Sequence, residues 1–99
     1  MPHRVTDAAL RDRLLSMQRR LEQGLAAADP HRRLVGRPVS YQVIAGQTFE
    51  ITYRDVTRID ETEVRGVKRL IGENCYWSVT PQGRETITVR FVVPLTEGT

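Results

Sequence analysis

Apolar residues recur at helical spacing in the first third of the chain. They lie three or four positions apart, which confines them to one narrow stripe of a helix. The stripe consists of Leu10, Leu14, Met17, Leu21 and Leu25. Asp29 and Pro30 end the pattern, because the residue before a proline is pushed out of the α region. The spacing predicts a helix over residues 6–28, with Leu15 off the stripe.

Residues 30–38, PHRRLVGRP, interrupt regular structure with two prolines and a glycine, and we interpret them as a linker. After the linker the hydrophobic period changes to two. The alternating positions are Val39, Tyr41 and Val43, followed after the turn AGQ by Phe49, Ile51 and Tyr53. This alternation predicts a β-hairpin with one apolar face.

The alternation breaks at Asp55. If the chain becomes helical there, with Asp55 as N-cap and Gly72 as the stop, the following apolar residues fall within an arc of about 140°. Those residues are Val56, Ile59, Val64, Val67, Leu70 and Ile71. The change of parity therefore favours a second helix over 55–72.

Three residues resist that interpretation. Asp60 and Glu63 lie inside the apolar stripe, and Gly66 costs roughly 1 kcal/mol relative to alanine in a helix interior. Two alternatives stay open. In one, the strand continues to about Ile59 with a bulge at the break, and a shorter helix is capped at Thr62. In the other, more strands follow and no second helix forms.

A second hairpin is predicted at the C-terminal end. Its alternating apolar residues are Cys75, Trp77 and Val79, then, after the turn TPQG, Ile87, Val89, Phe91 and Val93. The predicted fold is α+β over a single domain, residues 1–99, with a four-stranded antiparallel sheet in the region 39–93 and helices on one face. The alternative is a helix plus a small β-barrel.

Composition and charge exclude several classes. Apolar residues make up 39% and charged residues 27% of 99 residues, which is typical of a folded globular chain and not of disorder. No run approaches the roughly 20 apolar residues that a membrane span needs, and the N-terminus lacks a signal-peptide core. We expect no membrane association, and a cytoplasmic protein or a component of a particle assembled inside the cell.

Motifs for catalysis and for cofactor or metal binding are missing from the sequence. His3 and His31 lie near the terminus and in the linker, and Cys75, the only cysteine, is expected on the buried face, where its thiol is inert. No metal-ligand spacing and no glycine-rich phosphate loop occurs. The acids of DETE, 60–63, fit the start of a helix. We expect no catalytic residue, no cofactor and no metal, and hence no enzyme.

Nucleic-acid binding is the alternative function. Residues 1–37 hold eight arginines against four acids, whereas residues 38–99 are slightly acidic. Arg32, Arg33 and Arg37 lie close together in the Arg-rich segment 31–37, where they could contact phosphates.

Protein binding or assembly is the function we expect first. The last strand, TITVRFVV over 86–93, is expected at an edge of the sheet, where unpaired backbone groups can accept a partner strand. The candidate interface residues are Leu15 on the helix surface and Thr88, Arg90 and Val92 on that strand. The partner would be another protein or a second copy of the chain.

The order helix, hairpin, helix across residues 8–72, with ITYRDVTRI leaving the hairpin, resembles small phage head–tail joining proteins of the gpW type. The hairpin from Cys75 to Val93 departs from that pattern. The resemblance implies a small structural or adaptor protein that acts in assembly.

Overall fold

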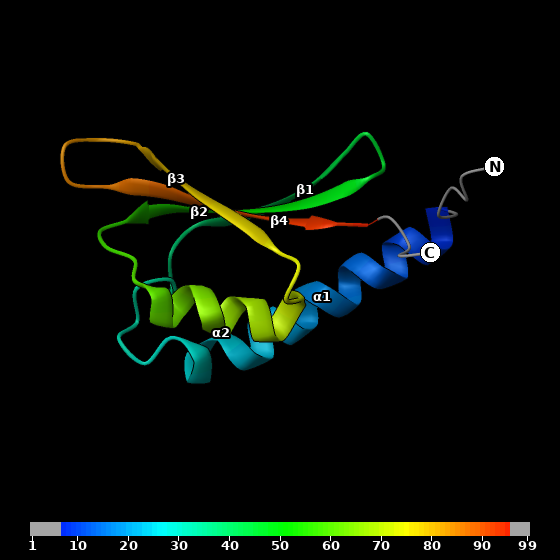
Figure 1. The fold of residues 1–99 in the computed structure, drawn as a ribbon, viewed down its shortest axis with the longest axis horizontal. Helices are drawn as coiled ribbons and strands as arrows, with labels where there is room; N and C mark the ends of the chain where they lie inside the picture. The colour runs from blue at the N-terminus through cyan, green and yellow to red at the C-terminus, as the bar shows by residue number, and fades with distance from the viewer. Residues whose placement is uncertain (1–6, 96–99) are drawn as a thin grey trace.

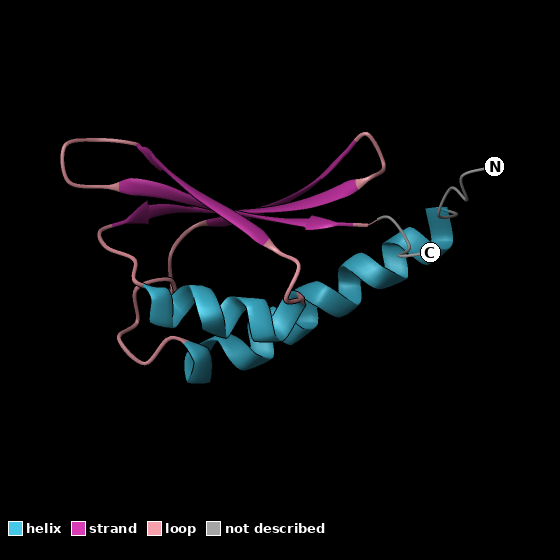
Figure 2. Cartoon of the chain, in the orientation of Figure 1, coloured by secondary structure: helices cyan, strands magenta, loops and turns pink. Residues whose placement is uncertain are grey.

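The computed structural model describes residues 7–95. Its elements in chain order are α1 (Asp7–Ala28), β1 (Val39–Ile44), β2 (Thr48–Val56), α2 (Glu61–Ile71), β3 (Tyr76–Pro81) and β4 (Ile87–Pro94). The strands form one open antiparallel sheet, and both helices lie on the same face of it (Figure 1, Figure 2). The α+β prediction is confirmed, and the alternative of a helix beside a small barrel is wrong.

The core lies between the helices and the sheet. The alternating residues of β2 and β4 face the helices and are buried, as the hairpin patterns predicted. They are Phe49, Ile51, Tyr53, Val89, Phe91 and Val93. The ring of Tyr53 packs edge-on against Phe91, with centroids 6.2 Å apart. Burial of such side chains is the main favourable contribution to folding.

Helix α1 matches the range predicted from its leucine stripe, and residue 6 lies outside the described residues. Met17 and Leu21 are buried, and the other three residues of the stripe pack against the core from its margin. Leu15 is 49% exposed, as its place off the stripe predicted. The helix period alone therefore identified the buried face.

The break at Asp55 is a β-bulge. Tyr53 pairs with Val89 and Val56 pairs with Ile87, so β2 holds one residue more than β4 across this interval. Asp55 has a φ of 58°, in the left-handed region. The extra residue returns Val56 to the buried face. A parity change is what a bulge produces, and a helix that begins at Asp55 is therefore wrong.

Helix α2 is shorter than the stripe suggested. Asp60 is its N-cap, and the Asp60 N–H donates to Glu63 Oε1 at 2.9 Å, half of a capping box. The bulged-strand alternative is thus confirmed in outline, although the strand ends at Val56 and the cap is not Thr62. The all-strand alternative is wrong.

Gly66 has a packing reason for its place inside α2. A Cβ at this position would lie 2.6 Å from the carbonyl oxygen of Ala28, at the end of α1. Only a residue without a side chain lets the two helices approach this closely, so the cost of glycine in a helix interior is offset by the helix contact.

The strand order β1-β2-β4-β3 overturns one expectation. β4 pairs with β2 on one side and with β3 on the other, so the strand predicted at an edge lies in the middle of the sheet. The inward side chains of Val89, Phe91 and Val93 on β4 are buried, whereas every residue of β3 is exposed. The hairpin therefore joins the sheet through its more apolar strand, and the edges are β1 and β3.

Replacing Leu21 with alanine should cost about 2–5 kcal/mol of unfolding free energy, because it empties a buried site in the core. Leu15→Ala, six residues earlier on the same helix, should change the unfolding free energy by less than about 0.5 kcal/mol. Denaturant unfolding of both variants checks this. Equal losses would show that the helix buries another face.

Candidate protein-binding edge

The linker before β1 is ordered by one buried carboxylate. Asp29 accepts hydrogen bonds from the backbone N–H groups of Arg33, Leu34 and Val35 at 2.9, 2.7 and 2.8 Å. This turn carries Leu34 into the core, where it is fully buried. The segment lacks helix and strand, as predicted, but its path is fixed by hydrogen bonds that satisfy otherwise unpaired donors.

Arg33 is held by two carboxylates of α2. Its Nη1 donates to Glu63 Oε1 at 2.8 Å and to Asp60 Oδ2 at 2.9 Å. The hydrogen bond with Glu63 is the largest of the effects that raise the pKa of Arg33 above its ordinary value. Glu63 is fully buried, so its charge needs this partner. The two acids that resisted the helix pattern therefore join α2 to the linker.

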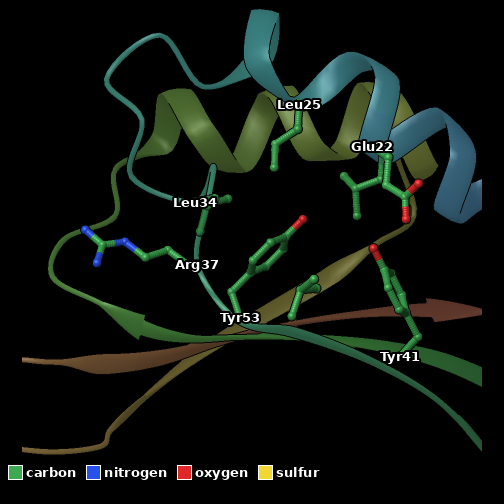
Figure 3. Close-up of a pocket in the computed structure, with 9 residues that line it drawn as sticks. Glu22, Leu25, Leu34, Arg37, Tyr41 and Tyr53 are labelled. Atoms are coloured by element: carbon green, nitrogen blue, oxygen red, sulfur yellow. The ribbon is translucent and has the colours of Figure 1, made fainter.

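The structure separates Arg33 from the other two arginines of the predicted cluster by its ion pairs. Arg33 is engaged by carboxylates, and the chain turns sharply at Arg32, whose φ is 53°. The Arg37 side chain lines a small pocket beside α1, and its guanidinium extends away from Tyr53 (Figure 3). Arg33 thus stabilises the fold, and the phosphate-binding set is reduced to Arg32 and Arg37.

The predicted interface residues of the last strand lie on the outer face of the central strand β4. Arg90 Nε lies 2.9 Å from Glu50 Oε1, and Thr88 donates to Gln82 Oε1 at 3.0 Å. Val92 is half-buried and stands opposite Glu50 in the ladder. With strands on both sides of β4, no added strand can pair there. Leu15 remains exposed on α1.

The free edge belongs to β3 instead. Tyr76, Trp77 and Val79 are 70%, 43% and 39% exposed, and they are three of the large apolar residues that the described chain exposes. Trp77 pairs with Phe91 and Val79 with Val89, so both face the helix side, as their alternation predicted. They were expected to be buried, and that is wrong because the helices do not cover this edge.

The backbone of β3 offers hydrogen bonds along that edge. Hydrogen-bonded and non-hydrogen-bonded pairs alternate in an antiparallel ladder. The Gln82 N–H donates to the Thr86 carbonyl at 3.1 Å, and the β3–β4 register is unbroken. Because the pairs alternate, the backbone N–H and C=O groups of the even-numbered residues of β3 bond to β4. The N–H and C=O groups of Trp77 and Val79 point outward.

Pro81 is the sequence signal that could have identified this edge. Proline lacks an N–H and is confined in sheets to edge strands, with the missing donor on the outer side. Pro81 falls on the same outward parity as Val79. The remainder of the strand, YWSVT, carries no charged side chain of the kind that protects exposed edges in natural proteins.

The far end of the β3–β4 hairpin is fixed to the bulge. The Asp55 N–H donates to Gln82 Oε1 at 2.9 Å, and Gln82 Nε2 donates in return to Asp55 Oδ1. This exchange reaches from β2 across β4 to the end of β3. These hydrogen bonds fix the position of the edge strand at its C-terminal end.

Cys75 lies at the other end of β3 and is buried, as expected from the sequence. Burial raises the pKa of the Cys75 thiol to about 11, and Lys68 offsets only part of that rise. The thiol is therefore protonated near neutral pH and a poor nucleophile.

The edge strand β1 is less suited to accept a partner. Its inward side chains Tyr41 and Val43 already pack against the core, and Tyr41 stacks on Phe49 with centroids 5.8 Å apart. Val39 and Ile44 are exposed, but they lie on opposite faces of the strand. An added strand would find less apolar surface here than at β3.

A small pocket lies between α1, the linker and the hairpin β1–β2. Its volume is about 90 Å³, well below the roughly 300–1,000 Å³ of ordinary ligand sites. Tyr41 and Tyr53 point their hydroxyls toward α1, where Glu22 lies close to Tyr41 (Figure 3). Burial raises the pKa of both tyrosines, and the charge of Glu22 adds to the rise at Tyr41. Both tyrosine hydroxyls therefore stay protonated near neutral pH.

The sequence matches no protein-family model and no curated protein. Within residues 7–95, no helix has the length and apolar character to cross a membrane. Nor does this part of the chain group three or more His, Cys, Asp or Glu side chains where they could hold a metal ion.

Arg33→Ala should destabilise the protein far more than Arg58→Ala. Arg58 also approaches Asp60, at 3.3 Å, but it is largely exposed, and exposed ion pairs contribute about 0–1 kcal/mol. Removing Arg33 leaves the buried Glu63 carboxylate without its cation. Unfolding at pH 7 should show the difference, and Glu63→Gln should recover part of the loss in Arg33→Ala. Similar losses for both arginines would contradict the assigned role.

Proposed function

We propose that this chain is a non-enzymatic protein-binding module that acts in assembly by taking up a strand along the free edge of β3. The observation that carries the proposal is an edge strand that is exposed along its whole length, uncharged, and apolar on its helix side. Strand addition draws affinity from backbone hydrogen bonds and specificity from alternate side chains. Trp77 and Val79 offer both kinds of contact.

Three further observations support this use of the edge. The hairpin is held at its tip by Gln82 and Asp55, so little ordering entropy is lost on pairing. Natural proteins usually protect edges with charges, prolines or bulges, and β3 has none of these between Tyr76 and Thr80. The resemblance of residues 8–72 to phage head–tail joining proteins agrees with an adaptor role.

The arginine segment supports nucleic-acid binding less well. Phosphate binding needs several cations on one accessible surface, and Arg33 is engaged by Asp60 and Glu63. Leu15 is a single exposed leucine, which is ordinary on a helix surface. The β3 edge is therefore the surface to test first.

Panning a random dodecapeptide library on the native protein tests the proposal without a known partner. Enriched peptides should be rich in β-branched and aromatic residues, and should bind Val79→Pro at least about tenfold more weakly, because proline removes an outward N–H and crowds the edge. Val43→Pro makes the matched change on β1 and should leave binding intact.

Amide hydrogen exchange locates the binding. The N–H groups of Trp77 and Val79 should exchange quickly in the monomeric protein at low concentration and become protected with an enriched peptide, whereas those of Ser78 and Thr80 should be protected in both states. Peptides that bind native protein and Val79→Pro equally, or that protect amides elsewhere, would contradict the proposal.

A further inference from the structure

We propose that the strand taken up at β3 is β3 of a second copy of this chain, paired antiparallel about a two-fold axis through Ser78. The inference rests on the proposed function of the same edge and adds its occupant and its register. It would join two sheets into one continuous sheet with both helix layers on the same side, since the axis is perpendicular to the sheet.

The backbone groups favour this register. With the axis through Ser78, Trp77 lies opposite Val79 of the second copy, and Val79 lies opposite Trp77 of the second copy. These are the residues whose N–H and C=O groups point outward. In antiparallel pairs such residues exchange both hydrogen bonds, so every free group of Trp77 and Val79 finds a partner.

The neighbouring registers satisfy fewer groups. With the axis through Trp77, Val79 would lie opposite Cys75, whose N–H already donates to the Gly72 carbonyl at 3.2 Å. With the axis through Val79, Trp77 would lie opposite Pro81, which has no N–H. The register through Ser78 also leaves Pro81 beyond the paired residues.

The side chains favour the same arrangement. Trp77 and Val79 would form two aromatic–β-branched pairs across the interface, a favourable cross-strand combination. Both side chains are now partly exposed on the helix side, so pairing would bury apolar surface that the helices leave uncovered. Tyr76 would lie opposite Thr80 of the second copy on the other face.

Charge also permits self-pairing. A strand that lies antiparallel to itself opposes its own residues, and like charges directly opposite each other destabilise a sheet. Residues 76–81 contain no charged side chain, so no such repulsion arises. A partner recognised through opposite charge would instead call for charged positions on β3.

Cysteine cross-linking tests the register. Ser78 would face Ser78 of the second copy in a non-hydrogen-bonded pair, with Cα atoms about 4.5 Å apart, within disulfide range. Ser78→Cys should therefore give a disulfide-linked dimer on mild oxidation, at least about tenfold faster than Thr80→Cys, whose two copies would lie roughly 13 Å apart. The native chain, in which Cys75 is the only cysteine, is the control for disulfides formed by that residue.

Light scattering over a concentration series tests the occupant. The native protein should dimerise, and Val79→Pro should raise the dissociation constant of the dimer by about tenfold or more, while Val43→Pro should not. A dimer that is lost in Val43→Pro, or a Ser78→Cys disulfide that forms no faster than that of Thr80→Cys, would overturn self-pairing through Ser78.

Different results would overturn the second-copy inference and the proposed function. If the native protein stays monomeric up to about 1 mM while panned peptides still bind it and not Val79→Pro, the second-copy inference is overturned and the proposed function stands. If neither copies nor peptides protect the amides of Trp77 and Val79, both are overturned.

Discussion

The buried carboxylate of Glu63 is the constraint on which the helix layer depends. A charge in the core must be paired, and its cation comes from Arg33 in the linker after α1. The same oxygen accepts the N–H of Asp60 and so fixes where α2 begins. With Asp29 holding the linker turn, the end of α1 and the start of α2 are joined. Gly66 then lets the two helices meet.

That junction also decides which part of the sheet is covered. The inward residues of β2 and of β4 from Val89 onward are buried beneath the helix layer, whereas β3 is exposed along its length. The bulge at Asp55 and the side chain of Gln82 hold β3 in place from the opposite end. The exposed edge is therefore a fixed feature of the fold and not a loosely attached strand, which is the property that strand addition requires.

An uncharged edge strand exposes a protein to unwanted pairing, and natural sequences usually avoid it. Here the surrounding structure is well protected: the outer face of the sheet is polar, and Arg90 pairs with Glu50 on it. Three of the large apolar residues that the described chain exposes, Tyr76, Trp77 and Val79, lie on this one strand. Their grouping on an uncharged edge is why we propose a function for β3.

The sequence by itself determined the first helix, the two hairpins and the side on which their apolar residues lie, but it left the second helix open. The helix period identified Met17 and Leu21, and the two-residue period identified the inward residues of both hairpins, because periodicity records which side of an element is apolar. Periodicity also detected an irregularity at Asp55 and two charged residues, Asp60 and Glu63, inside an apolar stripe. It did not reveal the cause of either feature.

Only the tertiary structure decided the order of the strands, the partner of Arg33 and the exposure of Trp77 and Val79. Each depends on contacts between residues distant in sequence, such as Arg33 with Glu63 or β2 with β4. A period of two gives the face on which a side chain lies, but not which strand is its neighbour or whether a helix covers it. The candidate site became visible only when β4 took the centre of the sheet and left β3 at the edge.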